Sequence, residues 1–208
     1  MRNFINMDIK LSKNLVQDRI CQMIYRAETF LKWTILLFNL YEKGSEKYKN
    51  KIEKLNNFYN KPATQCIVLH HVLYFQEVIL ALNTLFEKKN KPSEISFCYY
   101  FKNIEKSELE KDIEILRKKY FDPELVKIRN KIFAHKQIYM VGDPVAGFIN
   151  PVNTEIVEKT NLIIQKLKEI AGNNFTCATN NYFEGLYKQA FDVVYKACEK
   201  YLTKEIEL

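Results

Sequence analysis

Residues 122–136 read Asp-Pro-Glu-Leu-Val-Lys-Ile-Arg-Asn-Lys-Ile-Phe-Ala-His-Lys, and the interpretation of the whole chain starts from this stretch. Asp122 before Pro123 is typical of an N-cap followed by proline at the first helical position. Apolar residues then recur at helical spacing. At about 100° per residue, Arg129 falls near the middle of the apolar arc and His135 falls at its edge. The stretch therefore predicts a helix that carries a cation on its apolar face.

An arginine on an apolar face needs an anion, because an unpaired guanidinium is costly to remove from water. Two interpretations compete. In the first, Arg129 pairs with a buried carboxylate, for which Glu77 is the first candidate, or lays its aliphatic stem along apolar surface. In the second, Arg129 binds a phosphate and His135 acts as acid or base, since the ordinary histidine pKa of about 6.5 suits proton transfer.

The pattern Arg129-Asn130-(four residues)-His135 resembles the signature of the HEPN superfamily (higher eukaryotes and prokaryotes nucleotide-binding). The run LRKKYFDPELVKIRNKIFAHK is similar to the branch grouped with bacterial abortive-infection, or phage-defence, systems. The resemblance is clear over residues 92–137 and faint elsewhere. It implies an all-helical fold, a homodimer with a composite cleft and a metal-independent endoribonuclease, often a toxin or a phage-defence effector. Some members are non-catalytic, so a module that binds RNA, a nucleotide or a protein is the alternative.

In the nuclease interpretation, the ribose 2′-OH attacks its own phosphate. His135 supplies acid or base catalysis, Arg129 binds the phosphate, and Asn130 contacts a phosphate oxygen or orients the imidazole. Arg129 and His135 diverge by about 120° and about 9 Å of rise, so either the helix breaks near His135 or two copies share their motifs across a twofold axis. Further RNA contacts are expected from neighbouring cations and one aromatic ring: Arg117, Lys118, Lys119, Lys131, Lys136 and Tyr139.

Composition narrows the class of protein. The 208 residues include 32 Lys and Arg against 25 Asp and Glu, a net charge of +7 that suits either an acidic partner such as RNA or a solvated lysine-rich surface. The five cysteines lack the spacing of a metal site, so no metal or cofactor is expected and reduced thiols are predicted. With neither a signal peptide nor a membrane span expected, the chain is predicted to be cytoplasmic. If it is a toxin, as the HEPN resemblance allows, an antitoxin protein is a further expected partner.

Few glycines and prolines favour long helices, and hence a single all-α domain over residues 1–208, an up-and-down bundle of about five to seven helices. Residues 1–10 are expected to be a frayed lead-in and 137–150 an irregular loop. In the second helix, His70 lies on the same polar line as Glu77 and is a candidate supporting residue, although a core or surface histidine is the plainer interpretation. The helices are expected at residues 11–41, 64–86, 94–103, 105–120, 122–135, 151–171 and 181–204.

Overall fold

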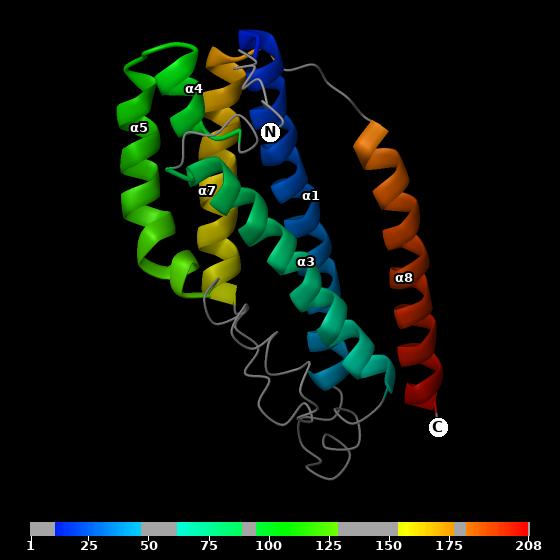
Figure 1. The fold of residues 1–208 in the computed structure, drawn as a ribbon. Coiled ribbons are helices and arrows are strands. Elements are labelled where there is room, and N and C mark those ends of the chain that lie inside the picture. Colours follow the sequence, from blue (N-terminus) through cyan, green and yellow to red (C-terminus); the bar gives the residue numbers. More distant parts are fainter. Residues whose placement is uncertain (1–10, 47–61, 89–94, 129–153, 177–181, 208) are drawn as a thin grey trace, which may run out of the picture.

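The computed structural model describes residues 11–46, 62–88, 95–128, 154–176 and 182–207. Every regular element in these ranges is helical, which confirms the predicted all-α fold class. Figure 1 shows their arrangement around the long first helix. The elements are α1 (Lys13–Glu46), α3 (Pro62–Phe86), α4 (Phe97–Asn103), α5 (Leu109–Leu116), the π-helix η1 (Arg117–Leu125), α7 (Thr154–Asn174) and α8 (Tyr182–Glu207).

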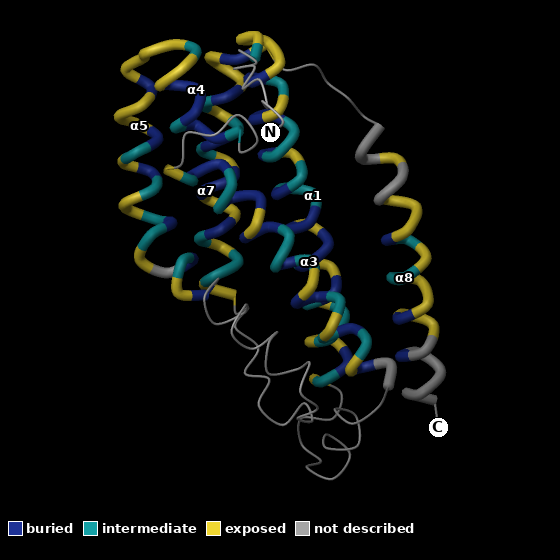
Figure 2. The backbone as a smooth tube through the Cα atoms, in the orientation of Figure 1, coloured by how far each residue is buried: buried dark blue, intermediate teal, exposed yellow. Residues whose placement is uncertain are grey.

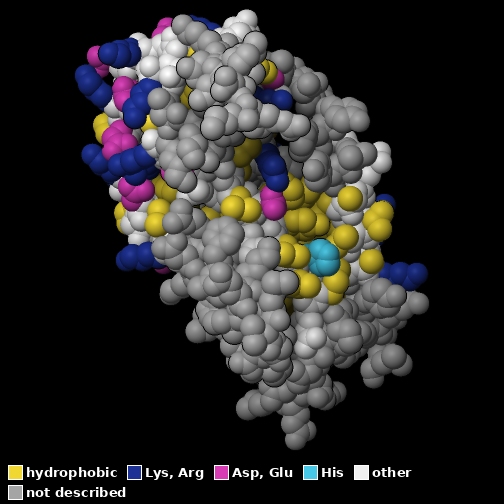
Figure 3. Space-filling view, in the orientation of Figure 1, with side chains coloured by type: hydrophobic (Ala, Val, Ile, Leu, Met, Phe, Trp, Pro, Cys, Tyr) yellow, Lys and Arg dark blue, Asp and Glu magenta, His cyan; other side chains and the backbone are white. Residues whose placement is uncertain are grey.

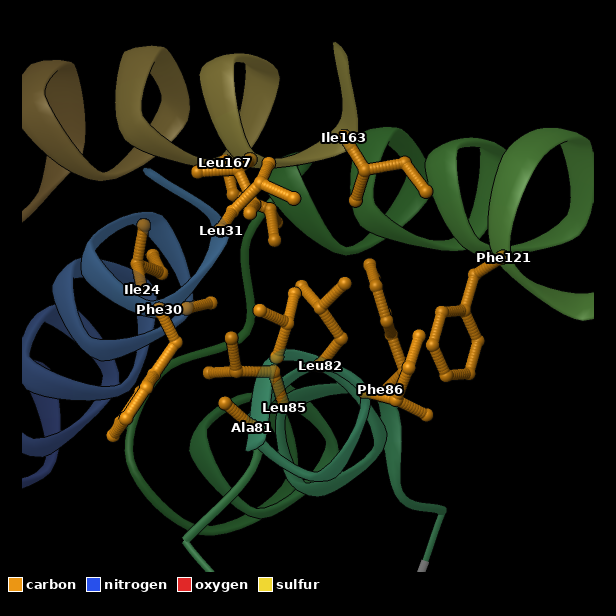
Figure 4. Close-up of a cluster of buried hydrophobic side chains, with 14 of the residues drawn as sticks. Ile24, Phe30, Leu31, Ala81, Leu82, Leu85, Phe86, Phe121, Ile163 and Leu167 are labelled. Carbon is orange, nitrogen blue, oxygen red and sulfur yellow. The ribbon is translucent and has the colours of Figure 1, made fainter. Parts of the chain in front are cut away.

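The core forms where α3 packs against α1, the most extensive helix–helix contact in the described ranges. Buried residues on both helices recur every three or four positions, which places them on one face of each helix. Figure 4 shows side chains of α3 gathered beneath those of α1 and α7. The close-up includes Ile24, Phe30 and Leu31 from α1, Ala81, Leu82, Leu85 and Phe86 from α3, and Ile163 and Leu167 from α7.

The last helix, α8, lies at one side of the bundle and contacts α1 and α3 (Figure 1). Its main anchor is Phe191, whose ring stacks on Trp33 of α1 with the centroids 4.8 Å apart and the planes nearly parallel. Figure 2 shows burial along the bundle side of α8 and exposure along its outer side. The described part of α8 therefore packs on the bundle through one face.

A chain of hydrogen bonds that begins in the core connects α1 to α4 and ends at an exposed carboxylate. The Gln17 amide donates to the Tyr100 hydroxyl at 3.0 Å, and that hydroxyl donates to Glu105 at 2.6 Å. The Ser96 hydroxyl caps α4 by accepting the Tyr99 N–H at 3.2 Å. Because the cap satisfies an otherwise free backbone donor, α4 begins at Phe97, three residues after the expected start.

Two helices continue past the glycines that end the apolar patterns of residues 11–41 and 151–171. Helix α1 includes Gly44, and α7 includes Gly172. A glycine inside a helix is unfavourable by about 1 kcal/mol, which continued hydrogen bonding and packing outweigh. In α7 the Phe175 N–H bonds to the Ala171 carbonyl at 2.8 Å, and the Phe175 ring is buried.

Helix α3 carries both buried and exposed apolar residues. Over Thr64–Phe86 it has the length and composition that a membrane span requires, a criterion that a buried core helix also meets. One face is enclosed by the bundle, whereas Leu69, Leu73 and Leu80 are exposed. The expected lead-in at 1–10 and the loop at 137–150 lie outside the described residues.

Two leucines of α3 provide a test of this packing. Leu82 is fully buried, so Leu82→Ala should lower the free energy of unfolding by about 2–5 kcal/mol through lost burial and the cavity left behind. Leu80, two residues away, is 37% exposed, and Leu80→Ala should lower it by less than about 1 kcal/mol. Urea unfolding of both variants measures the difference, and equal losses would contradict the assigned faces.

Candidate functional site

The helix that leads into the Arg129 motif does not begin at Asp122. Helix α5 passes directly into η1, and η1 passes into a further α-helical turn that includes Ile128. The predicted N-cap at Asp122 and the predicted end of the preceding helix at residue 120 are therefore both wrong. Arg117, Lys118 and Lys119 lie in the middle of this continuous helix, so a C-terminal helix dipole does not explain their position.

Proline is accommodated inside this helix because the backbone widens. In an α-helix the ring of Pro123 would collide with the Lys119 carbonyl four residues earlier. In η1 the bonding shifts to a five-residue spacing, as the bond from the Val126 N–H to the Phe121 carbonyl shows. The same spacing brings the Arg117 guanidinium within 2.8 Å of the Asp122 carboxylate. Asp122 thus braces the wide turn instead of starting a helix.

Arg117 forms ion pairs with two carboxylates. Its Nε and Nη2 donate to both oxygens of Glu114 at 2.9 and 2.7 Å, and Nη1 reaches Asp122. The hydrogen bonds from Arg117 lower the pKa of Glu114 to about 2. Because the Arg117 side chain is 11% exposed and already paired, a phosphate would have to displace an existing partner. The Lys118 ammonium lies 3.4 Å from the same Glu114 carboxylate, but its side chain is 67% exposed, so this ion pair faces solvent.

The buried face of this helix anchors the chain immediately before the motif. Phe121, Leu125 and Ile128 are buried. The centroids of the Phe121 ring and the Phe86 ring of α3 lie 4.9 Å apart. Figure 4 shows these two side chains next to each other. The apolar face expected from the sequence is thus confirmed as far as Ile128. The motif and its predicted neighbours lie outside the described residues: Arg129, Asn130, Lys131, His135, Lys136 and Tyr139.

Glu77, the expected carboxylate partner of Arg129, has an ion-pair partner on α1. Its Oε2 accepts a hydrogen bond from Nη2 of Arg26, and the Arg26 guanidinium also lies 5.7 Å from the centre of the Phe30 ring. The Glu77 charge is therefore balanced by Arg26. Its predicted contact with Arg129 involves a residue beyond the described ranges and stays a prediction.

The two histidines of α3 occupy different environments. The His70 ring is partly exposed, and its Nδ1 lies 2.8 Å from the Cys66 carbonyl and 3.5 Å from the Cys66 sulfur. His71 is 2% exposed, stacks on Phe38, and has a buried Nε2 without a hydrogen-bond partner. His71 is thus a core histidine, and burial lowers its pKa to about 4.

The cysteines fall into two groups. Cys21 is disulfide-bonded, so the prediction of reduced thiols is wrong at that position, whereas Cys66, Cys98 and Cys198 are free. The sulfurs of Cys66 and Cys198 lie within hydrogen-bonding distance of each other. Sequence reasoning missed this pair because the two residues lie on different helices and no short motif links them. Among the described residues, no group of three metal-ligating side chains could hold a metal ion.

A groove of about 450 Å³ separates α5 and η1 from α7. Lys119 and Lys166 supply positive charge, and Asp112 and Glu169 balance it. Tyr120 contributes an aromatic wall, and the Lys119 ammonium lies 5.1 Å from the centre of its ring. Because the formal charges cancel, this groove alone does not form a strong site for a polyanion.

No protein-family model, curated protein or solved structure matches this chain. The HEPN resemblance therefore depends on the residues of the motif and of the helix that precedes it.

Variants of Arg117 and Lys118 test whether the ion pairs of Arg117 with Glu114 and Asp122 stabilise η1. Arg117→Met should lower the free energy of unfolding by about 1–3 kcal/mol, because it leaves Glu114 and Asp122 without their shared donor. Lys118→Met removes the same charge from an exposed side chain and should change it by less than about 0.5 kcal/mol. Chemical denaturation measures both values, and indistinguishable variants would contradict the brace.

His71 should make stability depend on pH. Its pKa rises from about 4 in the folded protein to 6.5 on unfolding, so the unfolded chain binds more protons between these values. Neutral His71 therefore contributes about 3 kcal/mol to the free energy of unfolding above pH 6.5. This contribution is lost as the pH falls toward 4.

Urea unfolding at pH 7.5 and at pH 5 measures this dependence. His71→Leu should flatten the difference between the two pH values, whereas His70→Gln, at the partly exposed neighbour, should retain it. A wild-type pH difference in His71→Leu would show that another group is responsible.

Proposed function

We propose that this protein is a metal-independent endoribonuclease of the HEPN type, acting as a homodimer in a toxin or phage-defence system. Arg129 binds the scissile phosphate, His135 donates or accepts the proton, and Asn130 orients one of the two. The proposal combines the motif with the all-helical fold of the described ranges.

One structural observation carries the proposal: the helix preceding the motif is locked into the core up to the residue before Arg129. Phe121, Leu125 and Ile128 are buried, and Phe121 packs against Phe86. A catalytic group is useful only if the scaffold limits its motion, since misplacement by about 1 Å lowers rates substantially. A π-helical turn directly before the motif is consistent with this interpretation, because such turns recur at functional sites.

The predicted phosphate contacts differ in their ion-pair partners and in their exposure to solvent. Arg117 serves as an internal ion-pair member, so the proposal gives it no RNA contact. Lys118 and Lys119 have exposed side chains and remain candidates for contacts with the RNA backbone. Lys131, Lys136 and Tyr139 follow from their sequence proximity to the motif. In this scheme Glu77 and His70 support the site through the α3 scaffold.

Cleavage of total RNA in the presence of EDTA tests the proposal. Wild-type protein should cleave RNA, and Arg129→Ala and His135→Ala should each lower the rate by about 10²–10⁴-fold, because each removes a group acting in the transition state. Lys127→Ala removes an exposed cation of the same helix and should retain activity.

The fold of each variant is checked by circular dichroism and thermal unfolding. Mixing the two inactive variants and re-forming dimers should restore part of the activity if the motifs act across a twofold axis. Undiminished cleavage by both motif variants would reject the nuclease assignment.

A non-catalytic interaction module is the second candidate, and the outer face of α3 favours it. Leu69, Leu73 and Leu80 form an exposed apolar line, and Figure 3 shows a hydrophobic surface around a histidine and an acid–base pair. Exposed apolar stripes of this kind occur at protein interfaces. RNA or protein binding that persists without any cleavage would support this second function over the first.

A further inference from the structure

Two free thiols from distant parts of the chain meet between α3 and α8. Cys66 lies in the first half of α3, and Cys198 lies in the second half of α8. Their sulfurs share a hydrogen bond, and both lie close enough to Tyr74 to influence its hydroxyl. Of the described residues, these are the two free cysteines that contact each other.

The two sulfurs differ in access. Cys66 is partly exposed, so a small reagent in solution can reach its sulfur, whereas Cys198 is 4% exposed. Burial, together with the neighbouring Cys66, raises the pKa of Cys198 to about 11, so its thiol is protonated near neutral pH. An oxidant from solution therefore reacts with Cys66 first, and the adjacent Cys198 is still a thiol at that point.

His70 places a hydrogen-bond donor beside the accessible sulfur. A carbonyl oxygen accepts but does not donate, so the 2.8 Å contact with the Cys66 carbonyl requires a proton on Nδ1 of His70. The same N–H lies 3.5 Å from the Cys66 sulfur. A thiolate at Cys66, the nucleophilic form of the side chain, can accept this hydrogen bond.

We propose that Cys66 is a site of oxidative modification and that its oxidised sulfur closes onto Cys198 to form a disulfide between α3 and α8. The oxidant is a hydroperoxide. The Cys66 thiolate attacks one peroxide oxygen, the O–O bond breaks, and the departing oxygen takes a proton to leave as an alcohol or as water. Cys66 then carries a sulfenic acid.

Attack by the Cys198 sulfur on that sulfenic acid forms the S–S bond, and the hydroxyl leaves with the Cys198 proton as water. Two thiols are thus oxidised by two electrons, and one hydroperoxide is reduced. This inference does not depend on the proposed nuclease.

The proposed disulfide would act on α8, which packs against α1 and α3. Among the side chains of α8 that the structure describes, Phe191, Cys198 and Leu202 are buried, at spacings of seven and four positions. A bond from Cys198 to α3 would fix the second half of this helix. The disulfide would also close a loop of more than 100 residues, which restricts the unfolded chain strongly.

Mild treatment of the full chain with hydrogen peroxide tests the proposal. Non-reducing peptide mapping by mass spectrometry should show Cys66 and Cys198 peptides linked within one chain, with two free thiols lost. The melting temperature should rise by about 5–15 °C. The fluorescence of Trp33, the one tryptophan of the chain, reports whether α8 stays docked, because Trp33 stacks on Phe191.

Cysteine variants separate the two steps. Cys198→Ser should stop at a sulfenic acid on Cys66, detectable with dimedone, and its melting temperature should not rise. Cys66→Ser, at the more exposed position, should lose both the sulfenic acid and the linked peptide. Cys98→Ser should behave like wild type, since Cys98 bonds to the Lys88 carbonyl away from the pair. Links between chains, or an equal rise in Cys198→Ser, would overturn the proposal.

Discussion

The packing of α3 against α1 is the interaction on which the remaining contacts depend. Phe75, Val78 and Leu82 are each fully enclosed, and burial of apolar surface at about 25 cal/mol per Å² makes such a face the main source of stability. The other described helices pack on this pair or on one another. At the end of α3, the Phe86 ring packs against the Phe121 ring, so the position of α3 also determines where the helix that precedes the motif is held.

Tertiary packing overrides a strong local signal at Pro123. The dipeptide Asp122-Pro123 matches a helix start, yet the structure carries one helix through it. Phe121 before the proline and Leu125 after it are both buried, so the helix keeps the same face toward the core past Pro123. Widening to a π-helix achieves this, and the ion pair from Arg117 to Asp122 stabilises the wide turn. A short sequence window contains no information about those distant contacts.

The pairing of the charged side chains also depends on the tertiary structure. Glu28 of α1 bonds Lys168 of α7 at 2.8 Å, Arg26 pairs with Glu77, and Arg117 pairs with Glu114. Two of these pairs join different helices, and the third lies within one helix. The sequence alone does not show which charged residues pair. Cations that look available in the sequence are therefore partly used within the protein. A phosphate that binds Arg117 would have to displace one of its carboxylate partners.

The sequence by itself determined the all-helical class and the approximate extent of most helices, because apolar residues that recur with a period of 3.6 favour helices wherever these pack. It also supplied the motif from Arg129 to His135, which no part of the described fold could have revealed. Only the tertiary structure decided the course of the helix through Pro123, the partner of Glu77, the different environments of His70 and His71 and the meeting of Cys66 with Cys198. These features depend on contacts between residues far apart in the chain, and spacing along one helix carries no record of such contacts.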